Sequence, residues 1–247
     1  MSEHLHLDWL LRELKLELVN VGDLPAEYGD FTSLPGDISS ATMNWDPSKR
    51  EDECSGQYME YFNRVLSDSN VAGTHGQFLA RDVKHDNRLL TVKSARWVIG
   101  GTTDVIIYRD TYDRSLANAK IVCQLKKDTK IRPHHLYQSF AELICGNTKA
   151  NQPVFAVLTD LGNVWEYMWL TRGVNDVAGV VHHAQFKTKE EGLSALVRIL
   201  HHTGETPCTT MEHITARKLE LETNVMAQTK YAASASDASV SKKRKSP

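Results

Sequence analysis

Residues 100–130 have the sequence GGTTDVIIYRDTYDRSLANAKIVCQLKKDTK, and they decide the fold that we expect for the chain. The stretch contains two runs of β-branched and apolar residues, VIIY and IVCQL, bounded by Gly, Asp, Asn and Arg. Two such runs separated by a polar segment are typical of the strands of a hairpin. We therefore expect a hairpin with its loop at residues 111–118.

Side chains alternate between the faces of a strand, which places Asp104 on one face of the first strand and Gln124 with Lys126 on one face of the second. An acid beside an amide and a lysine suits phosphodiester hydrolysis with Mg²⁺ or Mn²⁺. Asp104 is the expected carboxylate ligand and Gln124 a neutral oxygen ligand. Lys126 would position or deprotonate water and offset charge on phosphorus. A solvated hairpin face carrying Asp and Lys is the alternative interpretation.

At these positions the sequence resembles the PD-(D/E)XK, or restriction-endonuclease-like, superfamily, in the variant with glutamine at the second acidic position. The resemblance implies an α/β fold with the core order α-β-β-β-α-β, in which helices flank a mixed central sheet. It also implies a nuclease that depends on a divalent metal ion.

Hydrophobic periodicity along the rest of the chain is compatible with this order. Leucines spaced as on one face of a helix predict an amphipathic helix at residues 5–19, which docks on the main domain or on a partner. Residues 22–53 are rich in Pro, Gly, Asp and Ser, so we expect a loop or extended arm attached to the domain by Trp45. The other expected elements are a helix at 57–66, a first strand within 89–99, a helix at 131–147, a buried parallel strand at 152–160, a more exposed strand at 165–170 and a helix at 190–201.

The resemblance implies further site residues on two of these helices. In restriction-endonuclease-like folds, the helix before the core strands often contributes a glutamate, and Glu60 is the candidate by position, with Glu51 and Glu53 as competitors. The helix behind the catalytic strand often carries a Gln or Glu that orients the site. Gln138 and Glu142 are four residues apart on that helix and face the same side. Ordinary surface positions are the alternative for both helices.

The amino-acid composition is that of a protein with a substantial hydrophobic core. The chain has 247 residues, 41% hydrophobic and 24% charged, and contains no run as long as a membrane span. Its N-terminus lacks a basic segment before the leucines, so we expect an intracellular protein or one whose leader has been removed. The cysteines are far apart in the sequence, which favours a reduced compartment and no zinc site; they are Cys54, Cys123, Cys145 and Cys208.

Charge is distributed unevenly. Residues 1–60 contain 13 acidic and 4 basic residues, whereas the rest of the chain contains 18 acidic and 25 basic residues. This asymmetry indicates a portion that faces a polyanion, with local compositional drift as the alternative. Basic residues near the predicted site are expected to bind nucleic acid; they are Lys120, Lys130 and Arg132, with Lys127 the weakest candidate. A cluster at the C-terminus predicts a nuclear import signal or a phosphate-binding tail; it consists of Lys242, Lys243, Arg244 and Lys245.

Several longer phrases resemble effector domains of the Crinkler type from oomycetes and fungi. They are G-x-T-D-V-I-x, Q-L-K, Q-S-F-A-E-L, V-F-A-V-L-T-D-L and W-E-Y-M-W-L, within about residues 90–172. The resemblance implies a protein that a microbe secretes and that acts in the host nucleus, where some members carry nuclease-like domains.

We therefore predict an endonuclease that depends on Mg²⁺ or Mn²⁺ and acts on DNA, or on RNA, in the nucleus. Its partners would be nucleic acid and a nuclear import receptor, with no membrane, and a homodimer is compatible with the sequence. The predicted organisation is an acidic helix and arm at 1–55, the nuclease domain at 56–203, an extension at 204–231 and a disordered basic tail at 232–247. An inactive nuclease-fold module that binds nucleic acid or a nuclear protein is the alternative. Metal binding by the histidine pairs at 134–135, 182–183 and 201–202 is a weaker hypothesis.

Overall fold

The computed structural model describes residues 3–29, 38, 42–68, 78–86, 89–93, 98–110, 116–127, 131–172 and 179–202. The predictions for Lys130, for Cys208, for residues 204–231 and for the basic tail at 232–247 lie outside the described residues. The tail includes the predicted import signal at 242–245.

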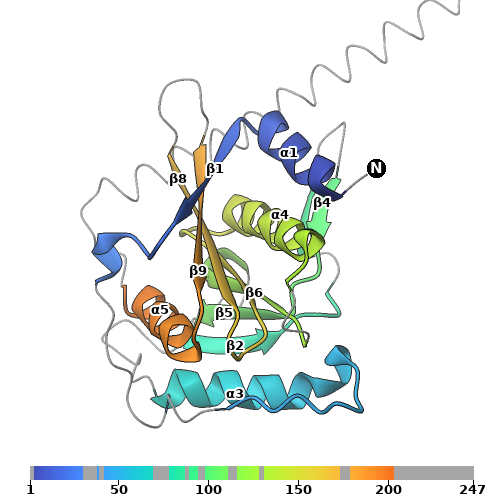
Figure 1. Ribbon diagram of the computed structural model, residues 1–247, viewed down its shortest axis with the longest axis vertical. Helices are drawn as coiled ribbons and strands as arrows, with labels where there is room; N and C mark the ends of the chain where they lie inside the picture. Colours follow the sequence, from blue (N-terminus) through green and yellow to red (C-terminus); the bar gives the residue numbers. More distant parts are fainter. Residues whose placement is uncertain are drawn as a thin grey trace, which may run out of the picture.

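Within the described residues, seven strands form one mixed sheet (Figure 1). Their order across the sheet is β1 (Leu16–Val21), β9 (Gly179–Phe186), β8 (Trp165–Arg172), β7 (Phe155–Thr159), β6 (Ala119–Leu125), β5 (Val105–Arg109) and β2 (Phe78–Asp82). The pairs β1/β9 and β6/β7 are parallel and the other neighbours are antiparallel. β3 (Leu90–Lys93) and β4 (Val98–Gly101) pair separately.

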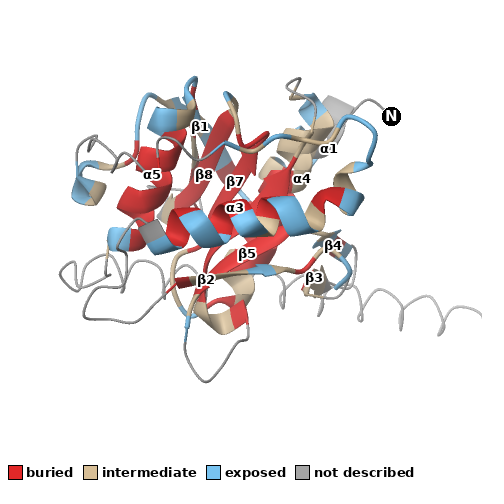
Figure 2. Cartoon of the chain, turned by 90° about the horizontal axis from the view of Figure 1, so that it is seen from below, coloured by how far each residue is buried: buried red, intermediate tan, exposed pale blue. Residues whose placement is uncertain are grey.

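Helices cover both faces of this sheet. α1 (Glu3–Glu13) and α4 (Pro133–Lys149) pack on one face, where Leu10 and Phe140 belong to a single apolar cluster. α3 (Ser55–Asp68) and α5 (Lys189–His201) pack on the other, where Phe62 and Leu196 share a second cluster. Figure 2 shows α3 lying across the sheet with its exposed stripe outward. The predicted α/β class, with a mixed sheet flanked by helices, is confirmed.

Local chemistry explains where α4 and α5 begin. Pro133 occupies the first turn of α4, where its missing N–H costs nothing. The Thr188 hydroxyl caps α5 by accepting a hydrogen bond from the Glu191 N–H at 3.2 Å. Gly192 then allows α5 to approach β8, because a Cβ at this position would lie 2.2 Å from the Trp165 ring. The predicted helices at 131–147 and 190–201 are both present.

The helix predicted at residues 5–19 is wrong in its second half. α1 ends at Glu13, Lys15 adopts a positive φ of 51°, and Leu16 begins strand β1. β1 gains a ladder of backbone hydrogen bonds with β9, which outweighs the helical spacing of the leucines. The apolar face of α1 docks on the domain as predicted, since Leu10 is buried, as is Leu14 just after the helix.

The structure changes three predictions about strands. β2 and β9 were not predicted, and the strand expected within 89–99 is divided between β3 and β4. β8 was expected to be more exposed, but residues 165–170 are buried because β9 and β1 extend the sheet beyond it. The buried parallel strand predicted at 152–160 is present as β7.

Two further findings concern the cysteines and the question of a membrane-spanning helix. Cys54, Cys123 and Cys145 are buried free thiols. In the part of the chain that the structure describes, no helix is both long and apolar enough to cross a membrane.

Candidate functional site

The hairpin of β5 and β6 brings Asp104 and Gln124 together. Asp104 immediately precedes β5, and its N–H donates to the Cys123 carbonyl at 3.1 Å. Its Oδ2 accepts from Gln124 Nε2 at 2.8 Å and from the Leu125 N–H at 2.7 Å. The Asp104 side chain is therefore held from two sides, and the residue is only 2% exposed. The predicted juxtaposition of Asp104 and Gln124 is present.

Lys126 follows β6 directly and lies at the same end of the hairpin. Its N–H donates to the Thr159 carbonyl at 2.9 Å, which fixes its backbone beside β7. Its Nζ lies 3.9 Å from Oε1 of Glu51, and its charge acts on Asp104. The lysine side chain is 15% exposed, so it is partly accessible from solvent.

Helix α4 extends the polar network behind Gln124. Gln138 Nε2 donates to Gln124 Oε1 at 2.6 Å and to Glu142 Oε1 at 3.1 Å, and it also lies 3.3 Å from the Thr102 carbonyl. Glu142 is fully buried, and its Oε2 has no hydrogen-bond partner among the described residues. A chain of hydrogen bonds thus joins Asp104, Gln124, Gln138 and Glu142, as the predicted role of the helix requires.

Lys84 is a member of the site that the sequence interpretation missed. It follows β2, and its Nζ lies 3.3 Å from Asp104 Oδ1 and 3.7 Å from Glu51 Oε1. The Val83 N–H donates to the Asp104 carbonyl at 3.0 Å, which brings the β2 end against the start of β5. No spacing rule connects residue 84 to residue 104.

Glu51 reaches the site because Lys127 anchors the segment that carries it. The Lys127 N–H donates to Glu51 Oε2 at 3.0 Å. The Lys127 ammonium donates to the carbonyls of Asp46 and Lys49, the latter at 2.6 Å. Trp45 attaches the same segment to the domain as predicted, by donating to the Asp160 carbonyl at 2.8 Å. Lys127 therefore organises protein structure, consistent with its rank as the weakest nucleic-acid-binding candidate.

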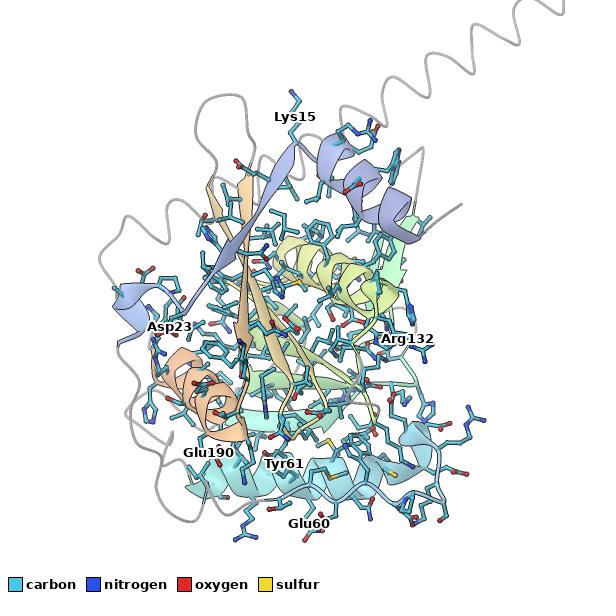
Figure 3. All side chains as sticks on the ribbon, viewed as in Figure 1. Lys15, Asp23, Glu60, Tyr61, Arg132 and Glu190 are labelled. Carbon is cyan, nitrogen blue, oxygen red and sulfur yellow. The ribbon has the colours of Figure 1, made fainter. Side chains whose placement is uncertain are left out.

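The structure does not bring Glu60 into this cluster. Tyr58 and Phe62 are buried on the inner face of α3, and a residue two positions from either lies on the opposite face of a helix. Glu60 is accordingly exposed, and it lines a shallow pocket of about 230 Å³ together with Arg64. Figure 3 shows it pointing away from the sheet. Glu51, named as a competitor, lies in the site instead, whereas the other competitor, Glu53, is exposed and accepts from the Arg50 N–H.

The predicted nucleic-acid-binding lysine at 120 is buried. The β5/β6 register shifts so that Ile107 pairs with Ile121 but Tyr108 pairs with Ala119, which leaves Lys120 as the extra residue of a bulge. It is 4% exposed, and burial together with the nearby Arg109 lowers the pKa of its ammonium to about 8. Lys120 is therefore not positioned to contact a phosphate backbone. Arg132, just before α4, is exposed (Figure 3).

The histidine pairs do not form a metal centre in the described residues. His182 and His183 point to opposite faces of β9, where His182 contacts Thr171 and His183 lies 2.5 Å from Glu166. In the described part of the chain, no group of three or more His, Cys, Asp or Glu side chains is arranged to hold a metal ion.

The two buried carboxyls, of Asp104 and Glu142, differ in the charges that surround them. Burial raises the pKa of Asp104, but the Leu125 N–H and the ammonium groups of Lys84 and Lys126 oppose that rise. Burial and the neighbouring Asp104 raise the pKa of Glu142 to about 8, despite the opposing hydrogen bond from Gln138. The protonated form of Glu142 is therefore favoured at neutral pH, whereas the pKa of Asp104 is raised by burial and held back by two ammonium groups.

The residues present fit a divalent cation, with one change to the expected ligand set. The carboxylates of Asp104 and Glu51 both face one cationic group, the Lys84 ammonium, and magnesium sites in proteins commonly use one or two carboxylates. Gln124 directs its amide nitrogen, not its oxygen, toward Asp104, and its oxygen accepts from Gln138. Gln124 would ligate a metal ion only after its amide turned over, so Asp104 and Glu51 form the better ligand pair.

Comparison with known proteins finds a similarity at low identity. The chain is similar to Crinkler effector proteins. It is 25% identical over 170 residues to Crinkler effector protein 161 of Phytophthora sojae, a match covering 64% of this chain and 36% of that protein. It is 23% identical over 175 residues to Crinkler effector protein 4 of Phytophthora capsici, a match covering 68% of this chain and 38% of that protein. It is 24% identical over 177 residues to Crinkler effector protein 2 of Phytophthora infestans, a match covering 68% of this chain and 36% of that protein.

The chain thus spans little more than a third of the length of the curated relatives it matches. No protein-family model and no solved structure matches it. The predicted relationship to Crinkler effectors is supported at this level, and the restriction-endonuclease-like assignment is not tested by it.

Proposed function

We propose that this chain is a restriction-endonuclease-like nuclease module of a microbial effector, which cleaves DNA with the help of a divalent metal ion. The observation that carries the proposal is the convergence of Asp104, Gln124, Lys126 and Glu51 from three separate segments at one end of the hairpin. Two carboxylates, an amide and a partly exposed lysine at one end of the hairpin form a donor set that suits phosphodiester hydrolysis.

The order of elements supports the restriction-endonuclease-like part of the proposal. α3, β2, β5, β6, α4 and β7 follow one another in the order α-β-β-β-α-β once the separate β3/β4 pair is set aside. β2, β5, β6 and β7 are neighbours in the sheet, and β6 and β7 are parallel with α4 between them in sequence. This order is compatible with the predicted core order if β2 takes the place of the strand expected within 89–99.

Each residue has a distinct role in the proposed reaction. A bound Mg²⁺ or Mn²⁺ would supply Lewis-acid stabilisation of the phosphate, held by Asp104 and Glu51. Gln124 orients Asp104 by donating to Oδ2. Lys126, whose side chain is partly exposed, positions the attacking water and offsets the negative charge that grows on phosphorus. Gln138 and Glu142 hold Gln124 from behind.

One observation favours the alternative of a binding module without catalytic activity. Lys84 occupies the space between the two carboxylates, and Gln124 turns its nitrogen toward Asp104. A site arranged in this way can be stable without a metal ion, as a nuclease fold retained for binding nucleic acid or a nuclear protein would be.

Cleavage of supercoiled plasmid separates the two functions. We expect the full chain to nick plasmid in Mg²⁺ or Mn²⁺. The nicking rate should fall at least about a hundredfold in Asp104→Asn and in Lys126→Met, since this is the effect of losing one group that stabilises charge in the transition state. Circular dichroism checks that both variants fold, and a single-stranded RNA substrate tests the choice of nucleic acid. Salt-sensitive DNA binding without cleavage, equal in wild type and both variants, would establish the binding module.

Nuclear action is the other part of the proposal. It is supported by the relationship to Crinkler effectors and by the basic cluster K-K-R-K at residues 242–245, which resembles a signal read by an import receptor. A fluorescent fusion of the full chain should accumulate in the nucleus of a transfected plant cell. Replacing the four basic residues with alanine should make it cytoplasmic, and unchanged nuclear accumulation would contradict this role.

A further inference from the structure

Lys84 places a positive charge where a metal ion would have to bind. Its Nζ lies 3.3 Å from Asp104 Oδ1 and 3.7 Å from Glu51 Oε1. These carboxylates come from segments 53 residues apart, and in the metal-free protein the ammonium offsets their mutual repulsion. A divalent ion between the same oxygens would bond them at about 2.1 Å, which leaves no room for the ammonium.

The Lys84 side chain can move while its backbone stays fixed. The Lys84 N–H donates to Asp82 Oδ1 at 3.1 Å, and Tyr58 holds the other oxygen of Asp82 at 2.9 Å. The Lys84 side chain is 21% exposed, so its flexible stem has a path toward solvent. Lys126 keeps its own contact with Glu51, so the site would retain one lysine when Lys84 leaves.

We propose that Lys84 is a resident cation that holds the two carboxylates together in the metal-free protein, that a divalent metal ion displaces it, and that its freed ammonium then contacts the substrate phosphate. The inference rests on the proposed metal site of the nuclease. It adds that the Lys84 ammonium competes with the metal ion for the carboxylates of that site. Metal binding and substrate binding are coupled as a result, because the metal ion frees the ammonium and the substrate phosphate gives it a new partner.

Isothermal titration of the full chain with Mn²⁺ alone, without nucleic acid, tests the displacement. Lys84→Met removes the competitor and should bind Mn²⁺ roughly fivefold more tightly than wild type, the effect of removing one modest ion pair. Lys84→Arg keeps the charge and should bind as wild type does. Lys84→Met should also melt at a lower temperature without metal and show a larger rise in melting temperature when Mn²⁺ is added.

Lys189→Met is the matched control. Lys189 is 19% exposed and lies 3.8 Å from Glu190 on α5, outside the site, so its loss should leave Mn²⁺ affinity unchanged. Equal or weaker Mn²⁺ binding by Lys84→Met would overturn the role of Lys84 while leaving the metal site in place. No Mn²⁺ binding by either wild type or Lys84→Met would overturn both this inference and the metal-dependent function.

Discussion

Replacing Glu142 with glutamine should make the protein more stable at high pH. The carboxyl is fully buried, and burial with the neighbouring Asp104 raises its pKa from an ordinary 4.5 to about 8. Glutamine has nearly the same shape and can still accept the hydrogen bond from Gln138, but it cannot ionise. The variant therefore removes the cost of a buried charge and keeps the packing.

The size of the effect follows from the two pKa values. Below pH 4.5 the carboxyl is protonated in both the folded and the unfolded chain, and its contribution to stability is fully present. As pH rises from 4.5 to about 8, the unfolded chain releases the proton and the folded chain retains it, so the free energy of unfolding falls. Each pH unit in this window costs about 1.4 kcal/mol, which gives about 4 kcal/mol between about pH 5 and about pH 9.

Urea denaturation of wild type and Glu142→Gln across this pH range measures the difference. We expect the two stabilities to diverge progressively, with the glutamine variant the more stable at the alkaline end. Glu60→Gln is the control, because it makes the same chemical change on the exposed face of α3 and should leave the pH dependence as in wild type. Parallel curves for wild type and Glu142→Gln would refute the assignment of the proton to Glu142.

Two further predictions concern the framework around the site. Gly192→Ala would place a Cβ 2.2 Å from the Trp165 ring and should lower the unfolding free energy in a urea titration by at least about 2 kcal/mol. Gly56→Ala, with nothing within 4 Å of the added Cβ, should be neutral or stabilising by about 0.5 kcal/mol. Equal effects of the two substitutions would argue against the close packing of α5 on β8. Trp45→Phe removes the 2.8 Å hydrogen bond to the Asp160 carbonyl and should lower the unfolding free energy by about 1 kcal/mol. Proteolysis within residues 42–50 should increase, because that segment loses one of its attachments to the domain. Unchanged proteolysis would show that Lys127 alone holds the segment.

The part of the site that sequence reasoning predicted is local. Asp104 lies directly before β5 and Gln124 lies in the neighbouring strand β6, so strand alternation in a predicted hairpin was enough to place them together. Helical spacing placed Gln138 and Glu142 on one side of their helix, and the resemblance implied that this helix lies behind the second strand and orients the site. In each case the contact depends on one short stretch or one regular period.

The missed parts depend on contacts between distant segments or on local irregularity. Lys84 and Glu51 are separated in the sequence by α3 and β2, and no residue pattern encodes their approach. Lys120 is buried because one register shift changes the direction of its side chain, and a bulge leaves no distinct pattern in the sequence. Strand β1 was read as helix because the spacing of Leu7, Leu10 and Leu14 seemed to continue, although the leucines after Lys15 alternate.

The choice between Glu51 and Glu60 tests the central claim most directly. The two glutamates are nine residues apart, but one lies 3.9 Å from Lys126 while the other is exposed on the outer face of α3. Plasmid cleavage in Mn²⁺ should therefore fall at least about a hundredfold in Glu51→Gln and remain at the wild-type rate in Glu60→Gln. Full activity of Glu51→Gln, or loss of activity in Glu60→Gln with the fold intact, would contradict the site described by Asp104, Lys126 and Glu51.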